Sequence, residues 1–529
     1  MRNFLFAGLV VAALLPRVAD AADGATASVT GGTIAGVEAN DVIVFKGIPY
    51  AAPPLGDLRW RAPQPVTPWS GTRSAAEFGN DCMQTPVADE AAPLGTAPSE
   101  NCLFVNVWRP ATDAPAGGYA VMVWIHGGGF LNGGASAPIY DGAALARRGI
   151  VVVSLNYRLG RLGFFAHPAL LAAQPTEAGN FGLMDQIAAL QWVQANIAAL
   201  GGDPGKVTIV GESAGGASVL ALLTSPKTAG LFRGAMIMSG GGRQTLISRP
   251  MTGGMPEVPA SEDGDAAYAR TLGIEGNGAD ALAKLRALPA EALVKDWTLP
   301  AMLGAVLGGK PLYDGIPMID GDTIIDTPQK TFAAGKEQHV PVIVGTTAQD
   351  VPVIFPPRTD PLSWFGPDRA AAKTVFDPDD TVPDFPLALT IASDISMHEP
   401  ARFVARSVTA NGEPAWLYRY TYAAQSLPKR LLGASHSQEV PFLFDNVDTR
   451  YGNETNDKDR EAARQFSGYV VNFVKTGDPN GGGLPNWPKF DAAQFDLMNF
   501  TLDDGPVFGA DPRAGRIRLV EAAADRPAQ

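Results

Sequence analysis

Residues 207–223 read VTIVGESAGGASVLALL. The stretch opens with a run typical of a buried strand, Val207–Val210, and closes with residues of a helix, Ser218–Leu223. Between them, GESAG at residues 211–215 matches G-x-S-x-G in the strand–turn–helix context that this pattern requires. Small residues must flank the serine because so tight a turn crowds the neighbouring backbone. The stretch therefore predicts that Ser213 presents its hydroxyl on a strained turn, with an ordinary Gly/Ser turn as the alternative.

The same strand-and-helix pattern continues on both sides of this stretch. Continuous apolar strands that alternate with helices indicate a parallel sheet covered on both faces. We therefore expect an α/β fold with a mostly parallel central sheet. The expected elements are strands at Tyr119–Ile125, Ile150–Leu155 and Pro341–Val344, and a helix at Leu183–Leu200 that Gly201 and Gly202 end.

The N-terminus reads as a secretory signal. Arg2 gives a positive start, Phe4–Leu15 is an apolar run of 12 residues, and Ala19 and Ala21 are small residues at the −3 and −1 positions of a cleavage site. Twelve residues are fewer than the roughly 20 that a membrane span needs, which argues against an N-terminal anchor. We predict that residues 1–21 are removed and that the protein is exported to the periplasm or the medium.

The remaining residues, 22–529, are expected to form a single domain. Their number alone would suggest about three domains. However, the chain contains neither a low-complexity linker nor a repeat, and its 59 glycines and 44 prolines are spread throughout. The weaker patterns at 240–310 and 350–430 are interpreted as insertions over one end of the sheet.

Composition narrows the possible partners. The chain has 41 Lys and Arg against 54 Asp and Glu, a net charge of −13, and it has no basic block, which argues against nucleic-acid binding. Past the signal, no stretch is long and apolar enough for a stable membrane span. Two cysteines cannot build a disulfide-rich scaffold or a four-cysteine zinc site. In an oxidising compartment Cys82 and Cys102 could pair, with two buried thiols as the alternative. The sequence does not indicate an oligomeric state.

A second motif, HGGG at residues 126–129, follows the strand Tyr119–Ile125. Glycines allow backbone N–H groups to approach a substrate oxygen closely. Each such donor is worth about 3–4 kcal/mol when charge develops on a carbonyl oxygen. The alternative, a phosphate-binding loop, lacks the Lys-Ser/Thr pair that would follow it. We expect an oxyanion loop of the kind found in lipases and esterases, with His126 holding the loop in place.

Ser213 needs a base, and the chain has five histidines. The order serine, acid, histidine favours a late histidine, and His436 lies in the small-residue segment 433–439. The other candidates receive no role. His167 precedes a proline in a loop, His339 is expected at the surface, and His398 is expected in a loop or at a helix end.

The acid should follow a strand between the serine and the histidine. Asp350 comes six residues after Val344, the last residue of the strand Pro341–Val344. There it would orient His436 and stabilise its charged form without taking the proton. A solvated loop carboxylate is the alternative.

Further blocks occur in order along the chain: FKGIPYA at 45–51, SENCLFVNV at 99–107, GNFGLMDQ at 179–186 and TGDPN at 476–480. Together with GESAG they resemble the type-B carboxylesterase family, which includes cholinesterases and bacterial para-nitrobenzyl esterases. The resemblance covers nearly all of the mature chain. It implies an α/β-hydrolase fold with large insertions, no metal or organic cofactor, and hydrolysis of a small or medium organic ester through an acyl-enzyme.

The resemblance also implies a role for each matching residue. Ser213 matches the nucleophile, and His436, followed by EVPF at 439–442, matches the base. The other matches are the oxyanion-hole N–H groups and the two cysteines of the family's first disulfide: Gly128, Gly129 and Ala214, with Cys82 and Cys102.

Two residues are expected beside the triad of Ser213, Asp350 and His436 without taking part in bond making. Glu212 matches a glutamate that usually lies near the histidine, with a buried, hydrogen-bonded structural carboxylate as the alternative. Ser239 is the other.

The chain departs from the family at the acid. The family reads G-T-x-x-D-E-G, with the glutamate catalytic, whereas here Asp350 and Val351 stand in place of E-G. Aspartate is shorter but chemically equivalent. If Asp350 did not serve, Glu399 or Glu439 would have to orient the imidazole.

The same residues would serve amide, carbamate or lactone hydrolysis, whereas a non-catalytic binding protein of this fold would lose the serine or the histidine. Pocket residues are expected in the insertions. Phe355, Trp364 and Phe365 could contact a substrate or pack within an insertion. Arg243 and Arg249 could meet a carboxylated substrate, with surface exposure preferred.

Overall fold

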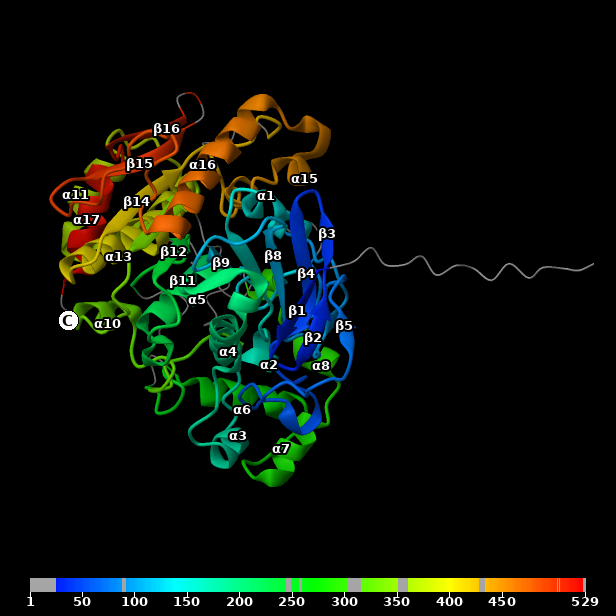
Figure 1. The fold of residues 1–529 in the computed structure, drawn as a ribbon. Helices are drawn as coiled ribbons and strands as arrows, with labels where there is room; N and C mark the ends of the chain where they lie inside the picture. Colours follow the sequence, from blue (N-terminus) through cyan, green and yellow to red (C-terminus); the bar gives the residue numbers. More distant parts are fainter. Residues whose placement is uncertain are drawn as a thin grey trace, which may run out of the picture.

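A large sheet crosses the whole molecule in the computed structural model (Figure 1). The structure describes residues 25–87, 92–243, 249–255, 259–302, 315–350, 360–427, 433–501, 503 and 505–526. The predicted signal peptide, residues 1–21, and Phe355 lie outside them. Within the described residues the sheet has 11 strands in the order β16-β15-β14-β13-β12-β11-β9-β10-β8-β4-β3.

The strands of this sheet come from nearly the full length of the described chain. They are β3 (Val37–Ala39), β4 (Val42–Pro49), β8 (Phe104–Pro110), β9 (Tyr119–Ile125), β10 (Val151–Leu155), β11 (Gly202–Glu212), β12 (Gly234–Met238), β13 (Val342–Thr347), β14 (Ala415–Tyr420), β15 (Asp496–Thr501) and β16 (Gly505–Ala510). All neighbours from β10 to β15 pair in parallel, and antiparallel pairs occur only towards the two edges. The predicted mostly parallel sheet is confirmed.

Two small sheets flank the large one. One contains β1 (Thr26–Val29), β2 (Gly32–Ala35) and β5 (Thr72–Ser74), and the other pairs β6 (Asp81–Cys82) with β7 (Pro98–Ser99). In Figure 1 the first of them lies beside β4 at one side of the molecule.

Both faces of the central strands are buried, which explains their continuous apolar sequences. Along β9, Val121 and Val123 point into one hydrophobic cluster and Met122 and Trp124 into another. Helices α4 (Phe181–Asn196), α5 (Ala214–Thr224) and α13 (Glu399–Ala410) cover the first face. Helices α1 (Ala143–Ala146), α14 (Val440–Leu443) and α16 (Asp457–Thr476) cover the second. This arrangement is the α/β-hydrolase fold.

The remaining helices lie around the edges of this sandwich. In the lower part of Figure 1 are α2 (Gly160–Gly163), α3 (Pro168–Ala173), α6 (Ser261–Thr271), α7 (Ala279–Arg286) and α8 (Ala290–Val294). The others are α10 (Pro328–Ala333), α11 (Arg369–Phe376), α12 (Asp384–Ser393), α15 (Val447–Tyr451) and α17 (Ala514–Ala524). Helices α11, α12 and α17 enclose a separate small hydrophobic cluster.

One expectation about the insertions is wrong. The region 350–430 is not only an insertion, because it contains β14, which pairs in parallel with both β13 and β15. The sequence of β14, AWLYRY, is rich in aromatic residues, but Arg419 interrupts the apolar run.

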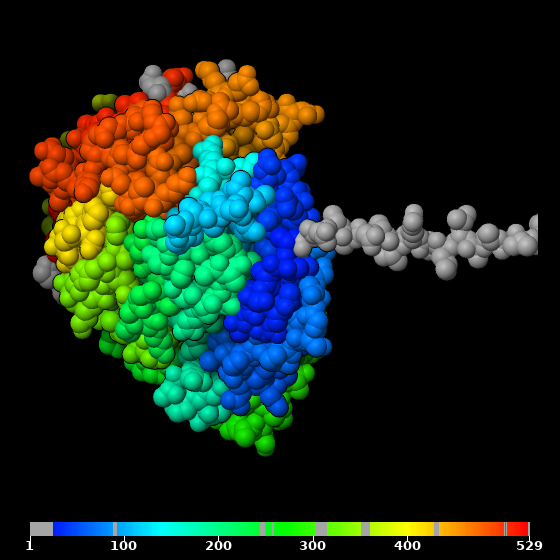
Figure 2. Space-filling view, in the orientation of Figure 1, coloured from blue at the N-terminus to red at the C-terminus, as the bar shows by residue number. Residues whose placement is uncertain are grey.

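Segments late in the chain pack on early ones. In Figure 2, the orange segment that contains α16 lies against the cyan segment. Arg148 Nη2 pairs with Asp445 Oδ2 at 2.6 Å, and Lys475 Nζ donates to the carbonyl of Arg148 at 2.5 Å. Among the described helices, none has both the length and the apolar character that a bilayer crossing demands.

Candidate active site

Ser213 lies in the turn between β11 and α5, with φ 57° and ψ −122°, which is strained for a residue with a side chain. The glycines of the motif are required by close packing. A Cβ on Gly211 would lie 2.4 Å from the carbonyl oxygen of Gly215, and one on Gly215 would lie 2.0 Å from that of Ile125. The serine N–H donates to the carbonyl of Met238 at 2.9 Å, which fixes the turn on the neighbouring strand.

The structure brings Ser213, His436 and Asp350 together. His436 Nε2 lies 2.9 Å from Ser213 Oγ, and its Nδ1 lies 2.6 Å from Asp350 Oδ1. The other carboxylate oxygen, Oδ2, accepts hydrogen bonds from Ser239 Oγ at 2.5 Å and from the Thr347 N–H at 3.1 Å. These residues follow β11, β12, β13 and β14, which are neighbours in the sheet, so the carboxyl ends of four parallel strands meet at one site.

Neighbouring charges shift the pKa values of His436 and Asp350 in opposite directions. Burial opposes a charge on His436, but the carboxylates of Glu212 and Asp350 outweigh this effect and raise the pKa of His436 above its ordinary 6.5. Burial would likewise raise the pKa of Asp350. The hydrogen bond and charge of His436, together with His398 and Ser239, lower the pKa of Asp350 instead. The imidazolium–carboxylate form of the pair is therefore favoured.

Glu212 satisfies both of its expected descriptions. It is buried and its Oε1 accepts a hydrogen bond from Ser437 Oγ at 2.6 Å. The same oxygen lies 3.4 Å from His436 Nε2. Burial raises the pKa of Glu212, with the nearby His436 charge acting in the opposite sense.

The two alternative acids do not contact the imidazole Nδ1. Glu399 is buried and bonds Arg243, with Oε2 2.7 Å from Nε of the guanidinium. Glu439 is also fully buried, and its carboxylate oxygens find no hydrogen-bond partner among the described residues. Burial, with the charges of Glu212 and Asp350, raises the pKa of Glu439 well above its ordinary value.

The glycine loop lies against the serine turn. A Cβ on Gly127 would lie 3.0 Å from Cβ of Ser213, so the loop and the serine are in contact. Gly128 and Gly129 have φ values of 108° and 65°, which glycine adopts without strain. Ala214 is the first residue of α5, so its N–H has no acceptor within the helix.

His126 anchors this loop to Tyr157. Its ring is buried and stacks on Tyr157, with centroids 4.5 Å apart, and the Tyr157 hydroxyl donates to the His126 carbonyl at 3.0 Å. Burial lowers the pKa of His126, which keeps the ring neutral. His126 therefore lies in the glycine loop that it was expected to hold.

The remaining histidines differ in their surroundings. His167 is buried and its Nδ1 accepts from the Ala169 N–H at 3.1 Å at the start of α3, whereas His339 is exposed. His398 is not in a loop, and of its two expected placements it takes the one at a helix end. It closes a π-helical turn, Asp394–His398, that runs directly into α13.

His398 is a residue near the site that the sequence interpretation missed. Its Nδ1 lies 2.7 Å from Asp394 Oδ1, and its Nε2 lies 3.1 Å from the carbonyl oxygen of Thr347, whose N–H bonds Asp350. The spacing of Asp394 and His398, four residues apart on one helical face, was the available signal.

One expectation for the arginines is wrong, and Phe365 takes one of its two expected placements. Arg243 is buried rather than exposed, and its guanidinium pairs with Glu399 at 2.5 Å and Asp525 at 2.8 Å. Its guanidinium therefore links α13 to the end of α17. Arg249 is half-buried. Phe365 is fully buried against α11 and α17, which is the packing alternative. Within the described ranges, no group of three or more His, Cys, Asp or Glu side chains is arranged to hold a metal ion.

The chain is similar to known proteins over most of its length. The sequence model of the Carboxylesterase family matches residues 23–361 and 377–510. Para-nitrobenzyl esterase of Bacillus subtilis is 36% identical over 472 residues, covering 87% of this chain and 91% of that protein. Fumonisin B1 esterase of Sphingopyxis macrogoltabida is 33% identical over 510 residues, covering 91% of this chain and 87% of that protein.

A mammalian protein and a solved structure are also similar to the chain over most of its length. Liver carboxylesterase 1 of Oryctolagus cuniculus is 33% identical over 503 residues, covering 86% of this chain and 84% of that protein. A solved structure of PNB esterase superposes with a TM-score of 0.78 at 30% identity, covering 94% of this chain and 99% of that one.

Proposed function

Because the chain belongs to the carboxylesterase family, we propose that it hydrolyses carboxylic esters through a covalent acyl-serine, with Ser213, His436 and Asp350 as its catalytic residues. One observation carries the proposal. His436 bridges Ser213 Oγ and Asp350 Oδ1 at 2.9 and 2.6 Å, which is the arrangement that lets an imidazole take the serine proton.

In the first half-reaction, neutral His436 accepts the hydroxyl proton at Nε2 while Ser213 Oγ bonds to the ester carbonyl carbon. The carbonyl oxygen becomes an oxyanion. The C–O bond to the alcohol then breaks, and His436 returns the proton to the leaving alcohol. Water repeats these steps on the acyl-serine and releases the acid. Asp350 holds the imidazole through Nδ1 and stabilises its charged form.

The oxyanion would be held by the peptide N–H groups of Gly128, Gly129 and Ala214. The contact between the glycine loop and the serine turn supports this assignment, as does the position of Ala214 at the start of α5. Each donor is worth about 3–4 kcal/mol in the transition state.

The proposed substrate is a small or medium organic ester. The similar proteins are named as enzymes that act on esters. They are a para-nitrobenzyl esterase, a fumonisin B1 esterase and a liver carboxylesterase. These names indicate a shared bond type and differ in the molecule that carries it, so they support the reaction class for this chain and leave the acyl and alcohol groups to experiment.

The deciding experiment compares the wild-type protein with Ser213→Ala on p-nitrophenyl acetate and butyrate and on the matching anilides. We expect ester hydrolysis by the wild type only, and labelling of Ser213 by phenylmethylsulfonyl fluoride. Near-wild-type turnover by Ser213→Ala would refute the proposal. Faster turnover of the anilides than of the esters would point to an amide hydrolase.

We also propose that residues 1–21 direct export. The disulfide between Cys82 and Cys102 is compatible with an oxidising compartment. The intact mass of protein recovered from periplasm and medium would test this, with Ala22 expected as the first residue. Full-length protein confined to the cytoplasm would refute it.

A further inference from the structure

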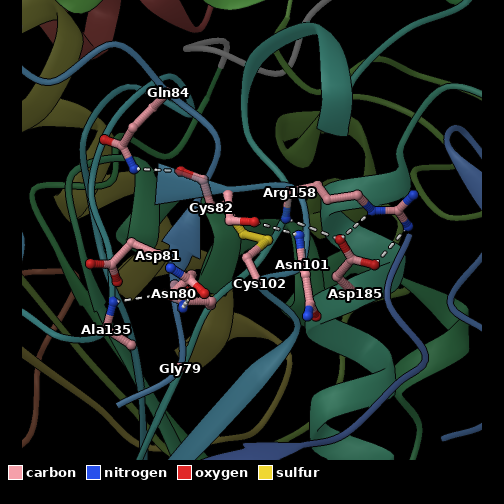
Figure 3. The surroundings of a disulfide bond; sticks show 12 residues. Gly79, Asn80, Asp81, Cys82, Gln84, Asn101, Cys102, Ala135, Arg158 and Asp185 are labelled. Atoms are coloured by element: carbon pink, nitrogen blue, oxygen red, sulfur yellow. Dashed lines mark hydrogen bonds and ion pairs between the residues drawn. A yellow bond between two sulfur atoms is a disulfide. The ribbon is translucent and has the colours of Figure 1, made fainter. Parts of the chain in front are cut away.

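The single disulfide of the described chain lies beside the oxyanion loop. Cys82 and Cys102 are bonded, and Cys82 closes the short strand β6. In Figure 3, Gln84 lies on one side of this bond with its amide directed back towards Cys82, while Arg158 and Asp185 form an ion pair on the other side. Residues 80–84, here called the disulfide segment, run alongside residues 132–136, which continue the oxyanion loop.

Gln84 joins the two segments. Its Nε2 donates to the carbonyl of Gly133 at 2.7 Å and to that of Cys82 at 2.9 Å, and its Oε1 accepts the Gly133 N–H at 2.9 Å. The side chain is only 4% exposed. Both amide hydrogens and an oxygen lone pair are thus used, and the side chain pairs with both polar groups of Gly133 as a neighbouring strand would.

Gly133 in turn packs on the glycine loop, residues 126–129. With φ 104°, its Cα faces the loop so closely that a Cβ there would lie 2.5 Å from the Gly127 carbonyl oxygen and 2.6 Å from His126 Nδ1. The carbonyl of Gly128 accepts the N–H of Asn132 at 2.9 Å, which closes the turn between them. A shift of Gly133 therefore moves Gly127 and Gly128.

Further bonds along the disulfide segment hold the same strip of chain. The Asp81 carboxylate is fully buried, accepts the Ser136 N–H at 3.3 Å, and also bonds the Ser136 hydroxyl. The Asn156 side chain accepts the Ala135 N–H at 2.8 Å and donates to the Asn80 carbonyl at 3.0 Å.

We propose that Gln84 is a positioning residue for ester hydrolysis: anchored next to the disulfide, it sets the position of Gly133 and thereby aims the N–H groups of Gly128 and Gly129 at the developing oxyanion. This inference rests on the proposed function. Gln84 touches no reacting atom, so its loss should weaken binding of the transition state and leave binding of the ground-state ester nearly unchanged.

The test is the variant Gln84→Met, which keeps the length and burial of the side chain but removes all of its hydrogen bonds. For p-nitrophenyl butyrate we expect kcat to fall about 10- to 100-fold, less than the loss of a whole oxyanion donor, with KM changed less than about threefold. An alkyl trifluoromethyl ketone, whose carbonyl becomes an oxyanion when Ser213 adds to it, should lose affinity in parallel with kcat.

Gln174→Met is the matched control. Gln174 is also a buried amide, and its Nε2 donates to the Trp60 carbonyl at 2.7 Å, away from the glycine loop. It should lower the melting temperature to a similar extent with kcat and ketone affinity unchanged. If Gln84→Met does not fold, Gln84→Asn, which is shorter by one methylene, should show the same pattern with a smaller loss.

The outcomes separate the two proposals. Ser213→Ala as active as wild type would refute the proposed function. An inactive Ser213→Ala together with a folded Gln84 variant that keeps wild-type kcat and ketone affinity would overturn the role of Gln84 alone, as would parallel losses in the Gln84 and Gln174 variants.

Discussion

The carboxylate of Glu212 lies 3.4 Å from Nε2 of His436, the same nitrogen that bonds Ser213 Oγ at 2.9 Å. In the proposed reaction, a negative charge at this position would stabilise the imidazolium that forms when the serine proton is transferred. It also stabilises the imidazolium of the resting protein, which cannot act as a base. In the proposed reaction, Glu212 would therefore favour the intermediate and restrict the pH range in which the neutral imidazole can act as a base.

The first prediction concerns this pH range. With the pKa of His436 above 6.5, the fraction of neutral imidazole, and hence kcat/KM, should rise with pH through the neutral range. In Glu212→Gln the charge that favours imidazolium is gone, so the acidic limb of the pH–kcat/KM profile should move to lower pH by about one unit. An unchanged limb in the folded variant would contradict the electrostatic role of Glu212.

The second prediction concerns Asp350. Asp350→Asn preserves the shape but removes the charge at Nδ1, and the amide group favours the wrong tautomer of His436. We expect kcat to fall roughly 10³- to 10⁴-fold with the fold intact. Ser239→Ala, which removes only the 2.5 Å bond to Oδ2, should cost much less. Equal losses in the two variants would show that Asp350 does not act through the imidazole.

The third prediction concerns His398, which bonds the Thr347 carbonyl while the Thr347 N–H bonds Asp350. His398→Phe leaves that carbonyl and one oxygen of Asp394 without their bonds, at a cost of about 1–3 kcal/mol in unfolding free energy. Because the turn that carries Asp350 is also loosened, kcat should fall.

His167→Ala is the control for this variant. It removes the bond to the Ala169 N–H at the start of α3, at a cost of about 1 kcal/mol. Its kcat should not change. If urea unfolding shows similar losses and neither variant alters kcat, His398 is only structural.

The three residues of the proposed triad could be predicted from the sequence because they follow strands, and strands leave a local pattern. The apolar run before Asp350 and the GESAG turn around Ser213 each specify a position at the carboxyl edge of the sheet. His436 needed the chain order and the family resemblance in addition, because its small-residue loop follows β14, which the sequence interpretation placed in an insertion.

The residues that the sequence interpretation missed are held by contacts distant in the chain. Gln84 bonds a peptide group 49 residues away, and His398 bonds one 51 residues away. Arg243 bonds a carboxylate 156 residues away. A side chain that bonds a remote backbone group leaves no periodicity in the sequence, so only a three-dimensional structure reveals it.

The last prediction uses the buried pair of Arg243 and Glu399, whose side chains are 7% and 1% exposed. Arg243→Met leaves the Glu399 charge buried without its partner, which should cost about 3–5 kcal/mol in unfolding free energy by urea denaturation. The double variant Arg243→Met/Glu399→Met removes both charges and should recover most of this loss, because well-packed apolar residues often replace a buried pair without cost. Arg369→Met, at an exposed pair with Asp360, should leave stability unchanged. If the double variant is no more stable than Arg243→Met, the penalty comes from lost packing on Phe403, which lies 4.2 Å below the guanidinium, rather than from the unpaired charge.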